Sequence, residues 1–216
     1  MIATDLLALL PIITLTCVIL IVMMVIAFAR NLALTCLCSS AGLALTLAAI
    51  AWVSINVEPQ SVTPLIVVDE YALLFSSIIV IGAFFICLLA YSYHAGRGEN
   101  QDEYLMLLLL STLGGVILSH SAHFASFILG MELVGVSLYA MISYPVRGFF
   151  SLEAALKYLI LSGVSSATLL FGIAFLFAVT GSLSFQGMAD ATAEMEHANV
   201  FVLIGATFVL AGIAFK

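Results

Sequence analysis

Runs of apolar residues that are long enough to cross a lipid bilayer dominate this sequence. A helix needs about 20 mostly apolar residues to cross roughly 30 Å of hydrocarbon, because each residue adds only about 1.5 Å of length. Seven segments meet or approach this length, and they are 6–29, 32–55, 71–93, 104–119, 124–144, 152–180 and 198–216. The sequence therefore predicts an all-α, polytopic bundle of about seven transmembrane helices.

The composition excludes several classes of function. Hydrophobic residues make up 64% of the chain and charged residues 8%, whereas soluble domains have roughly 45–50% apolar and about 25% charged residues. Too few polar side chains remain to cover a surface that faces water. We therefore exclude a soluble enzyme, a nucleic-acid-binding protein with a basic patch and a disordered segment. The net charge of −7 arises mostly from acids in the short breaks between the apolar runs.

The few basic residues predict the orientation of the chain in the membrane. Arg30, Arg97 and Arg147 fall in alternate breaks. The other breaks contain neither lysine nor arginine, and they are 56–70, 119–123 and 181–197. Cytoplasmic loops carry an excess of basic residues. We therefore expect the arginines on the cytoplasmic side and the N-terminus in the periplasm.

Glu132 lies near the middle of the fifth apolar run. A charged side chain at that depth costs at least about 2.5–3.5 kcal/mol, so such residues usually face the interior of the bundle and take part in function. The alternative is a protonated glutamic acid that joins two helices by a hydrogen bond. We favour the functional interpretation, in which Glu132 exchanges a proton.

Glu153 and Lys157 lie four residues apart at the beginning of the sixth run, in the order that favours an ion pair on one helix face. They fit a solvated structural pair and a member of a proton path equally well. Further along the same run are three hydroxyl groups that could hold water, those of Ser162, Ser165 and Ser166.

Lys216 ends the seventh run, and the pattern alone favours a lysine at the membrane interface. The histidines lie at the ends of runs rather than at the depth where a haem would need them, and they are His94, His120, His123 and His197. The pair His120 and His123 lacks a third metal ligand, and no C-x-x-C motif or nucleotide-binding motif occurs. We expect no metal, redox centre or cofactor in this chain.

Together, the residues around Glu132, Lys157 and Lys216 resemble the antiporter-like membrane subunits of the bacterial proton-pumping NADH:quinone oxidoreductase, respiratory complex I. The resemblance covers essentially the whole chain. It rests on the strings VTPLIVVD (62–69), EYLMLLLL (103–110), HFASFILGMEL (123–133), SLEAALKYLILS (151–162) and TGSLSF (180–185). The last two strings favour the subunit called N over its relatives M and L.

The resemblance implies a role for each ionisable residue in the translocation of protons. Glu132 would modulate the charge of its neighbours, Lys216 would be the central proton carrier, and Lys157 would be a second lysine on the path. His123 and Glu153 would support them. This role for Lys216 replaces the interfacial interpretation given by the pattern alone.

The resemblance also has implications for the assembly. FMN, iron–sulfur clusters and quinone would be bound by other subunits, and the partners would include the membrane subunits M, L, K, J and A, in the bacterial inner membrane. Residues 1–103 would form three N-terminal helices, and 104–216 the first part of an antiporter-like repeat. A second, inverted repeat would follow Lys216, so either the protein is larger than this sequence or this is a truncated form.

Two other functions are compatible with the same residues. A subunit of an Mrp-type cation/proton antiporter would use the same bundle with similar glutamate and lysine residues. Alternatively, the chain could be a membrane scaffold in which the buried charges only hold helices together.

Overall fold

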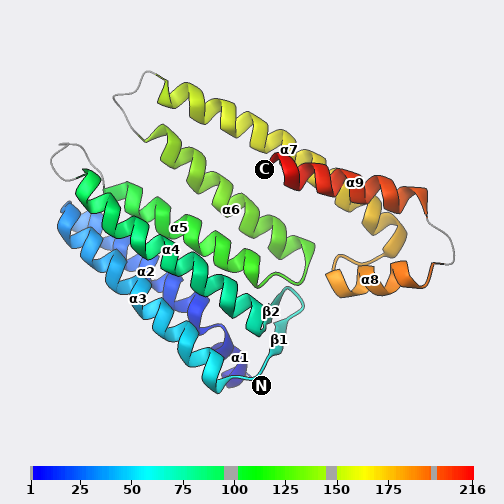
Figure 1. Ribbon diagram of the computed structural model, residues 1–216, viewed down its shortest axis with the longest axis horizontal. Helices are drawn as coiled ribbons and strands as arrows, with labels where there is room; N and C mark the ends of the chain where they lie inside the picture. Colours follow the sequence, from blue (N-terminus) through cyan, green and yellow to red (C-terminus); the bar gives the residue numbers. More distant parts are fainter. Residues whose placement is uncertain (1, 95–101, 145–149, 196–198) are drawn as a thin grey trace.

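The computed structural model describes residues 2–94, 102–144, 150–195 and 199–216, and it consists almost entirely of helices. Arg97, Arg147 and His197 lie outside the described residues. The long helices run side by side as an elongated bundle (Figure 1). The helices are α1 (Ile2–Ala8), α2 (Leu10–Phe28), α3 (Leu32–Asn56), α4 (Glu70–His94), α5 (Asp102–Ser119), α6 (Phe124–Ser143), α7 (Ser151–Thr180), α8 (Phe185–Ala193) and α9 (Val200–Phe215).

Six of these helices, α2 to α7, are long and apolar enough to cross a membrane. Their outward faces carry large apolar side chains such as Phe28 and Ile55, which are 83% and 81% exposed. Such exposure suits contact with lipid and not with water. The structure therefore confirms the predicted polytopic all-α bundle.

Two of the predicted spans differ from the structure. The first run, 6–29, is divided at Leu9 into α1 and α2, and Pro11 lies in the first turn of α2, where a missing N–H is tolerated. The last run forms the 16-residue helix α9, which extends about 24 Å and is shorter than the usual hydrocarbon thickness. The first span therefore begins a few residues later than expected, and only the last of the seven predicted spans is shorter than a full span among the described residues.

Two breaks that the sequence analysis treats as connections contain regular structure. The first contains the antiparallel hairpin of β1 (Gln60–Thr63) and β2 (Ile66–Val68). The second contains α8, whose N-terminus is capped by the Ser184 hydroxyl accepting the Gly187 N–H at 3.0 Å. Both elements lie at the same end of the bundle (Figure 1).

Backbone hydrogen bonds join the three base-free breaks at that end. The Val67 N–H donates to the His120 carbonyl at 2.9 Å, the Ala122 N–H to the Leu65 carbonyl at 3.0 Å, and the Phe185 N–H to the Ala122 carbonyl at 3.1 Å. The described parts of the breaks, 56–70, 119–123 and 181–195, therefore share one side, as their alternation along the chain predicts.

The buried apolar side chains form two clusters. One is built from α1 to α5 together with β2, and the other from α6 to α9. Helix α5 supplies Leu105 and Leu109 to the first cluster and also packs closely against α6. The division into 1–103 and 104–216 stays a prediction.

Glycines allow the closest helix contacts in the second half of the chain. A Cβ atom on Gly172 of α7 would lie 2.7 Å from the Gly205 carbonyl oxygen of α9, and one on Gly212 of α9 would lie 2.7 Å from the Cβ of Leu169. Real Cβ atoms do not approach other heavy atoms so closely. Helix α9 therefore packs directly on α7, and its C-terminal end reaches α6 (Figure 1).

Candidate functional site: a partly buried charge pair between three helices

Three polar side chains from three helices meet inside the second half of the bundle. Glu132 comes from the middle of α6, Ser166 from the middle of α7, and Lys216 from the residue after α9. The Lys216 Nζ lies 2.5 Å from the Glu132 Oε1 and 2.7 Å from the Ser166 Oγ. The Ser166 hydroxyl donates to the same Glu132 oxygen at 2.5 Å. The three groups form a closed triangle of hydrogen bonds, which we call the charge triad.

Small residues of α6 and α7 lie beside the lysine. Gly135 lies three residues after Glu132, and a Cβ atom at that position would be 3.6 Å from the Lys216 Cε. On the other side, the Ser165 hydroxyl donates to the Gly212 carbonyl at 2.5 Å and ties α7 to the last turn of α9. The lysine is thus positioned by the packing of α7 on α9, and its side chain lies in ordinary contact distance of Gly135 on α6.

The two charged groups differ in burial. The side chain of Lys216 is 8% exposed and that of Glu132 is 44% exposed. Removing an ammonium group from water costs several kcal/mol unless an opposite charge and further hydrogen bonds compensate, and Glu132 and Ser166 supply both. Lys216 therefore belongs to the interior of the bundle and not to its interface with water.

This arrangement can hold and release a proton. An opposite charge at hydrogen-bonding distance favours the protonated lysine, because the attraction is weakly screened in a low-dielectric interior. Any movement or neutralisation of Glu132 would remove that support. The Ser166 hydroxyl can accept from the ammonium group and donate to the carboxylate at once, so it links the two groups.

Lys157 and Glu153 form a separate pair. Their charged atoms are 2.6 Å apart, and their side chains are 74% and 56% exposed. Lys157 lies nine residues before Ser166 on α7, which is about 14 Å along the helix axis. The structure thus brings Glu132 and Lys216 together and places Lys157 at the outer surface of the bundle, away from the charge triad.

The two histidines next to α6 have different surroundings. His123 caps α6, since its Nδ1 accepts the Ala125 N–H at 3.0 Å. His120 is 1% exposed and its Nδ1 lies 2.9 Å from the Val116 carbonyl oxygen, which assigns the proton to Nδ1. In the part of the chain that the structure describes, no three His, Cys, Asp or Glu side chains cluster in a way that suits a metal ion.

Sequence reasoning did not identify Ser166 as a partner of both charges. It recognised the serine hydroxyls of this helix only as groups that could hold water. The i, i+4 spacing of Ser162 and Ser166 places both on one face, and the sequence gives no indication that this face meets Glu132. Only the packing of α6, α7 and α9 provides that information.

The second half of the chain also matches a known family. Residues 121–216 match the family described as NADH:quinone oxidoreductase/Mrp antiporter, transmembrane. This region contains α6 to α9 and therefore all three members of the charge triad. The match supports an antiporter-like subunit of the complex I type.

Solved structures with the same fold come from two respiratory assemblies. A chain of respiratory complex I from Thermus thermophilus with bound aureothin has a TM-score of 0.77 and 22% identity, over 94% of this chain and 43% of that chain. A chain of the archaeal membrane-bound sulfane sulfur reductase has a TM-score of 0.76 and 23% identity, over 98% of this chain and 44% of that chain. Both similarities concern the fold, and the present chain spans less than half the length of either match.

Proposed function

We propose that this chain is part of a proton-translocating membrane subunit of a NADH:quinone oxidoreductase, with subunit N as the most similar type. The observation that carries the proposal is the charge triad, in which a lysine with 8% exposure contacts a mid-helix glutamate at 2.5 Å. Buried ionisable pairs are costly in a membrane and typical of ion and proton pathways. The family match over residues 121–216 supports the same function.

In the proposed mechanism, Glu132 is the switch and Lys216 is the proton carrier. While the two groups are in contact, the carboxylate favours the protonated lysine. When Glu132 moves away or is neutralised, Lys216 loses this support and releases its proton into a hydrated path. When the contact re-forms, Lys216 takes up another proton. Ser166 contacts both groups and can guide the proton between them.

Lys157 and Glu153 belong to the outer part of this proposed path. Their exposed pair on α7 would be the group from which protons reach the triad or pass sideways to a neighbouring subunit. His123 acts by capping α6 and thus by fixing the helix that carries Glu132. We place the N-terminus in the periplasm and the protein in a bacterial inner membrane.

The driving force would come from electron transfer in other subunits. FMN, iron–sulfur clusters and quinone are proposed to be held there, and the membrane subunits M, L, K, J and A are the proposed partners. This chain would contribute part of the proton path. The oxidation of NADH by quinone would be coupled to the path through changes in charge at the subunit contacts.

A second candidate is a subunit of an Mrp-type cation/proton antiporter. The matched family description includes this class together with the oxidoreductase, and a partly buried glutamate–lysine pair serves both functions. Sodium-dependent proton exchange in vesicles that lack NADH would favour the antiporter. NADH-driven proton uptake without any sodium requirement would favour the oxidoreductase.

The decisive experiment is NADH-driven proton uptake into inverted membrane vesicles that contain the Glu132→Gln variant of the full-length protein. Glutamine keeps the size of the side chain and removes its charge, so we expect proton uptake and quinone-linked NADH oxidation to fall together. Glu194→Gln changes an exposed acid after α8 and is the matched control, with activity expected to stay at the wild-type level.

A native gel separates this function from a purely structural one. If the Glu132→Gln variant assembles normally and pumping falls, Glu132 belongs to the coupled proton path. If the assembly is lost, or if pumping is unaffected, the pair holds helices together as in a scaffold, and the proposed function of the triad is wrong.

A further inference from the structure

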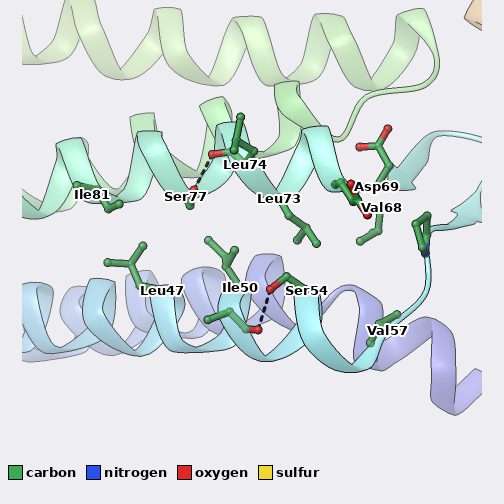
Figure 2. A pocket seen from close by; sticks show the side chains of 13 residues that line it. Leu47, Ile50, Ser54, Val57, Val68, Asp69, Leu73, Leu74, Ser77 and Ile81 are labelled. Atoms are coloured by element: carbon green, nitrogen blue, oxygen red, sulfur yellow. Dashed lines mark hydrogen bonds between the residues drawn. The ribbon is translucent and has the colours of Figure 1, made fainter.

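A pocket lies between α3 and α4, far from the charge triad. Its volume is about 600 Å³, and its walls include Leu47 and Ile50 of α3 and Leu73 and Ile81 of α4. Figure 2 shows these side chains facing one another across the space between the two helices. Pockets of about 300–1,000 Å³ are the size that binds small ligands. The function proposed above does not use this pocket.

The walls are effectively apolar along most of their length. Ser54 and Ser77 also line the pocket, but their hydroxyls donate to carbonyls of their own helices, those of Ala51 at 2.9 Å and Leu74 at 2.6 Å (Figure 2). Neither hydroxyl proton remains for a ligand. A hydrocarbon chain suits these walls better than a polar molecule does.

The depth of the pocket corresponds to one leaflet of a bilayer. Its polar end is at Glu70, where α4 begins, and its far end includes Ile81, eleven residues later. That separation is about 16 Å along the helix, and half of a hydrocarbon core of roughly 30 Å is about 15 Å. A lipid chain that starts at the headgroup level beside Glu70 would thus end near the bilayer centre beside Ile81.

Acidic groups surround the polar end of the pocket. Asp69 and Glu70 line it, and Asp69 is fixed there because its Oδ1 accepts the Ala72 N–H at 2.7 Å. That bond leaves Oδ2 to accept from another donor. Among the described residues, the arginine and the lysines lie elsewhere, because Arg30 precedes the opposite end of α3 and the lysines belong to α7 and the end of α9. His120 lies near Asp69, but burial lowers its pKa and disfavours its cationic form. The mouth therefore favours a cationic hydrogen-bond donor and disfavours an anion.

We propose that this pocket binds a phospholipid with a primary amine, such as phosphatidylethanolamine. One acyl chain would occupy the space between α3 and α4, and the ammonium group would donate hydrogen bonds to Asp69 and Glu70. Phosphatidylglycerol has no cation to offer. The trimethylammonium group of phosphatidylcholine has no N–H to donate. The site thus distinguishes lipids by headgroup and not by chain alone.

The test measures lipids retained by the full-length protein in its membrane assembly. The assembly is purified in detergent and incubated with ethanolamine, glycerol or choline phospholipids that have identical chains, and native mass spectrometry counts the lipids bound. We expect the ethanolamine lipid to be retained several-fold better than the other two. A photoactivatable group on its acyl chain should cross-link to residues 47–57 and 73–81.

Three variants separate the headgroup contact from the chain contact. The double variant Asp69→Asn, Glu70→Gln keeps an oxygen that can cap α4, and it should abolish the preference for ethanolamine. We expect the retention of the ethanolamine lipid to fall about threefold for each acid removed, which is the contribution of one partly exposed ion pair. Glu58→Gln removes an acid from the same connection that does not line the pocket, and the preference should remain. Ala51→Phe fills the pocket and should abolish acyl-chain cross-linking.

Several results would overturn the proposal. Equal retention of all three lipids would exclude headgroup recognition. An equal effect of Glu58→Gln would mean that the general surface charge, and not the pocket, selects the lipid. If the acyl chain cross-links to other helices of this chain, or to a helix of another subunit, the lipid does not lie in this pocket. The pocket would then have a different occupant.

Discussion

At the scale of single residues, Ser166 is the side chain that contacts both members of the partly buried charge pair. We expect Ser166→Ala to slow NADH-driven proton uptake by up to about tenfold, which corresponds to roughly 1.4 kcal/mol, the low end for a hydrogen bond to a charged group. The loss should be smaller than for Glu132→Gln, because the ion pair itself remains. Initial rates of uptake in inverted vesicles provide the measurement.

The control for Ser166 is on the same helix. The Thr168 hydroxyl donates to the Val164 carbonyl of its own helix at 2.8 Å, so Thr168→Val removes a hydroxyl without touching the charge triad. Its rate of proton uptake should equal that of the wild type. Equal losses in both variants would mean that helix packing, and not the triad, controls the rate.

The burial of His120 predicts that the stability of the protein depends on pH. Burial lowers the pKa of His120 below its ordinary value of 6.5, although the hydrogen bond to the Val116 carbonyl and the charge of Asp69 act in the opposite direction. Below pH 6.5 the unfolded chain binds a proton that the folded protein resists, so the free energy of unfolding falls as the pH decreases. Above pH 6.5 this contribution is constant.

The measurement is the thermal unfolding of the detergent-solubilised protein between pH 5 and pH 8. The wild type should lose stability on the acid side, and His120→Asn should lose less, because asparagine can donate to the Val116 carbonyl without titrating. The same acid slope in both proteins would assign the effect to other groups.

At the scale of elements, the contact between α7 and α9 predicts opposite effects for two glycines of one helix. Gly172→Ala would force the Cβ to within 2.7 Å of the Gly205 oxygen, whereas nothing lies within 4 Å of a Cβ at Gly163. We expect Gly172→Ala to cost about 1–3 kcal/mol of stability and Gly163→Ala to be neutral or to stabilise by about 0.4–1 kcal/mol.

Thermal unfolding of the two variants tests this prediction. Proton uptake should fall only in Gly172→Ala, because the displacement of α9 also moves Lys216 away from Glu132. If Gly163→Ala destabilises the protein as much as Gly172→Ala does, a contact with another subunit dominates, and the close packing of α7 on α9 is not the cause.

The long helices could be predicted from the sequence because apolar length is a local property of the chain. The hairpin at 60–68 and α8 could not, since backbone hydrogen bonds to distant residues hold them in place, such as those from Val67 to His120 and from Phe185 to Ala122. In the apolar run at 6–29, Pro11 is a signal for a helix start that fits the interruption at Leu9, but the prediction from apolar length alone did not use it.

The candidate site could be predicted in part. Glu132 stands out because an acid in an apolar run is costly. Lys216 has no such signal, because its position at the end of an apolar run favours a lysine at the membrane interface. Only the family resemblance identified Lys216 as a site residue. Its contact with Glu132 spans 84 positions in the sequence and depends on how α9 packs on α7, which a residue pattern does not contain.

At the scale of the whole molecule, the two ends of the bundle differ in charge and structure. One end holds the hairpin and α8. The other holds Arg30 near Tyr144, whose hydroxyl donates to Glu103 at 2.8 Å. Burial and the Glu103 carboxylate raise the pKa of Tyr144, and Arg30 offsets part of this rise. The proposed orientation places the arginine end in the cytoplasm.

Labelling of single cysteines tests this orientation. In a variant without the native cysteines, Ser61→Cys in β1 should react in intact cells with a maleimide that does not cross the inner membrane. Ala29→Cys, at the end of α2, should react only after the membrane is opened. Both positions are exposed. The reverse pattern would place the N-terminus in the cytoplasm.

The short distance between Glu132 and Lys216 has a consequence for helices that touch neither residue. Two opposite charges 2.5 Å apart act at a distance as a small dipole, whose field decreases much faster than that of a single charge. While the contact lasts, neighbouring groups experience almost no net charge from this site. When the contact breaks, the two charges no longer cancel, and once Lys216 has released its proton the Glu132 carboxylate remains as a single charge, so a displacement of a few ångströms becomes an electrical signal that distant groups can sense.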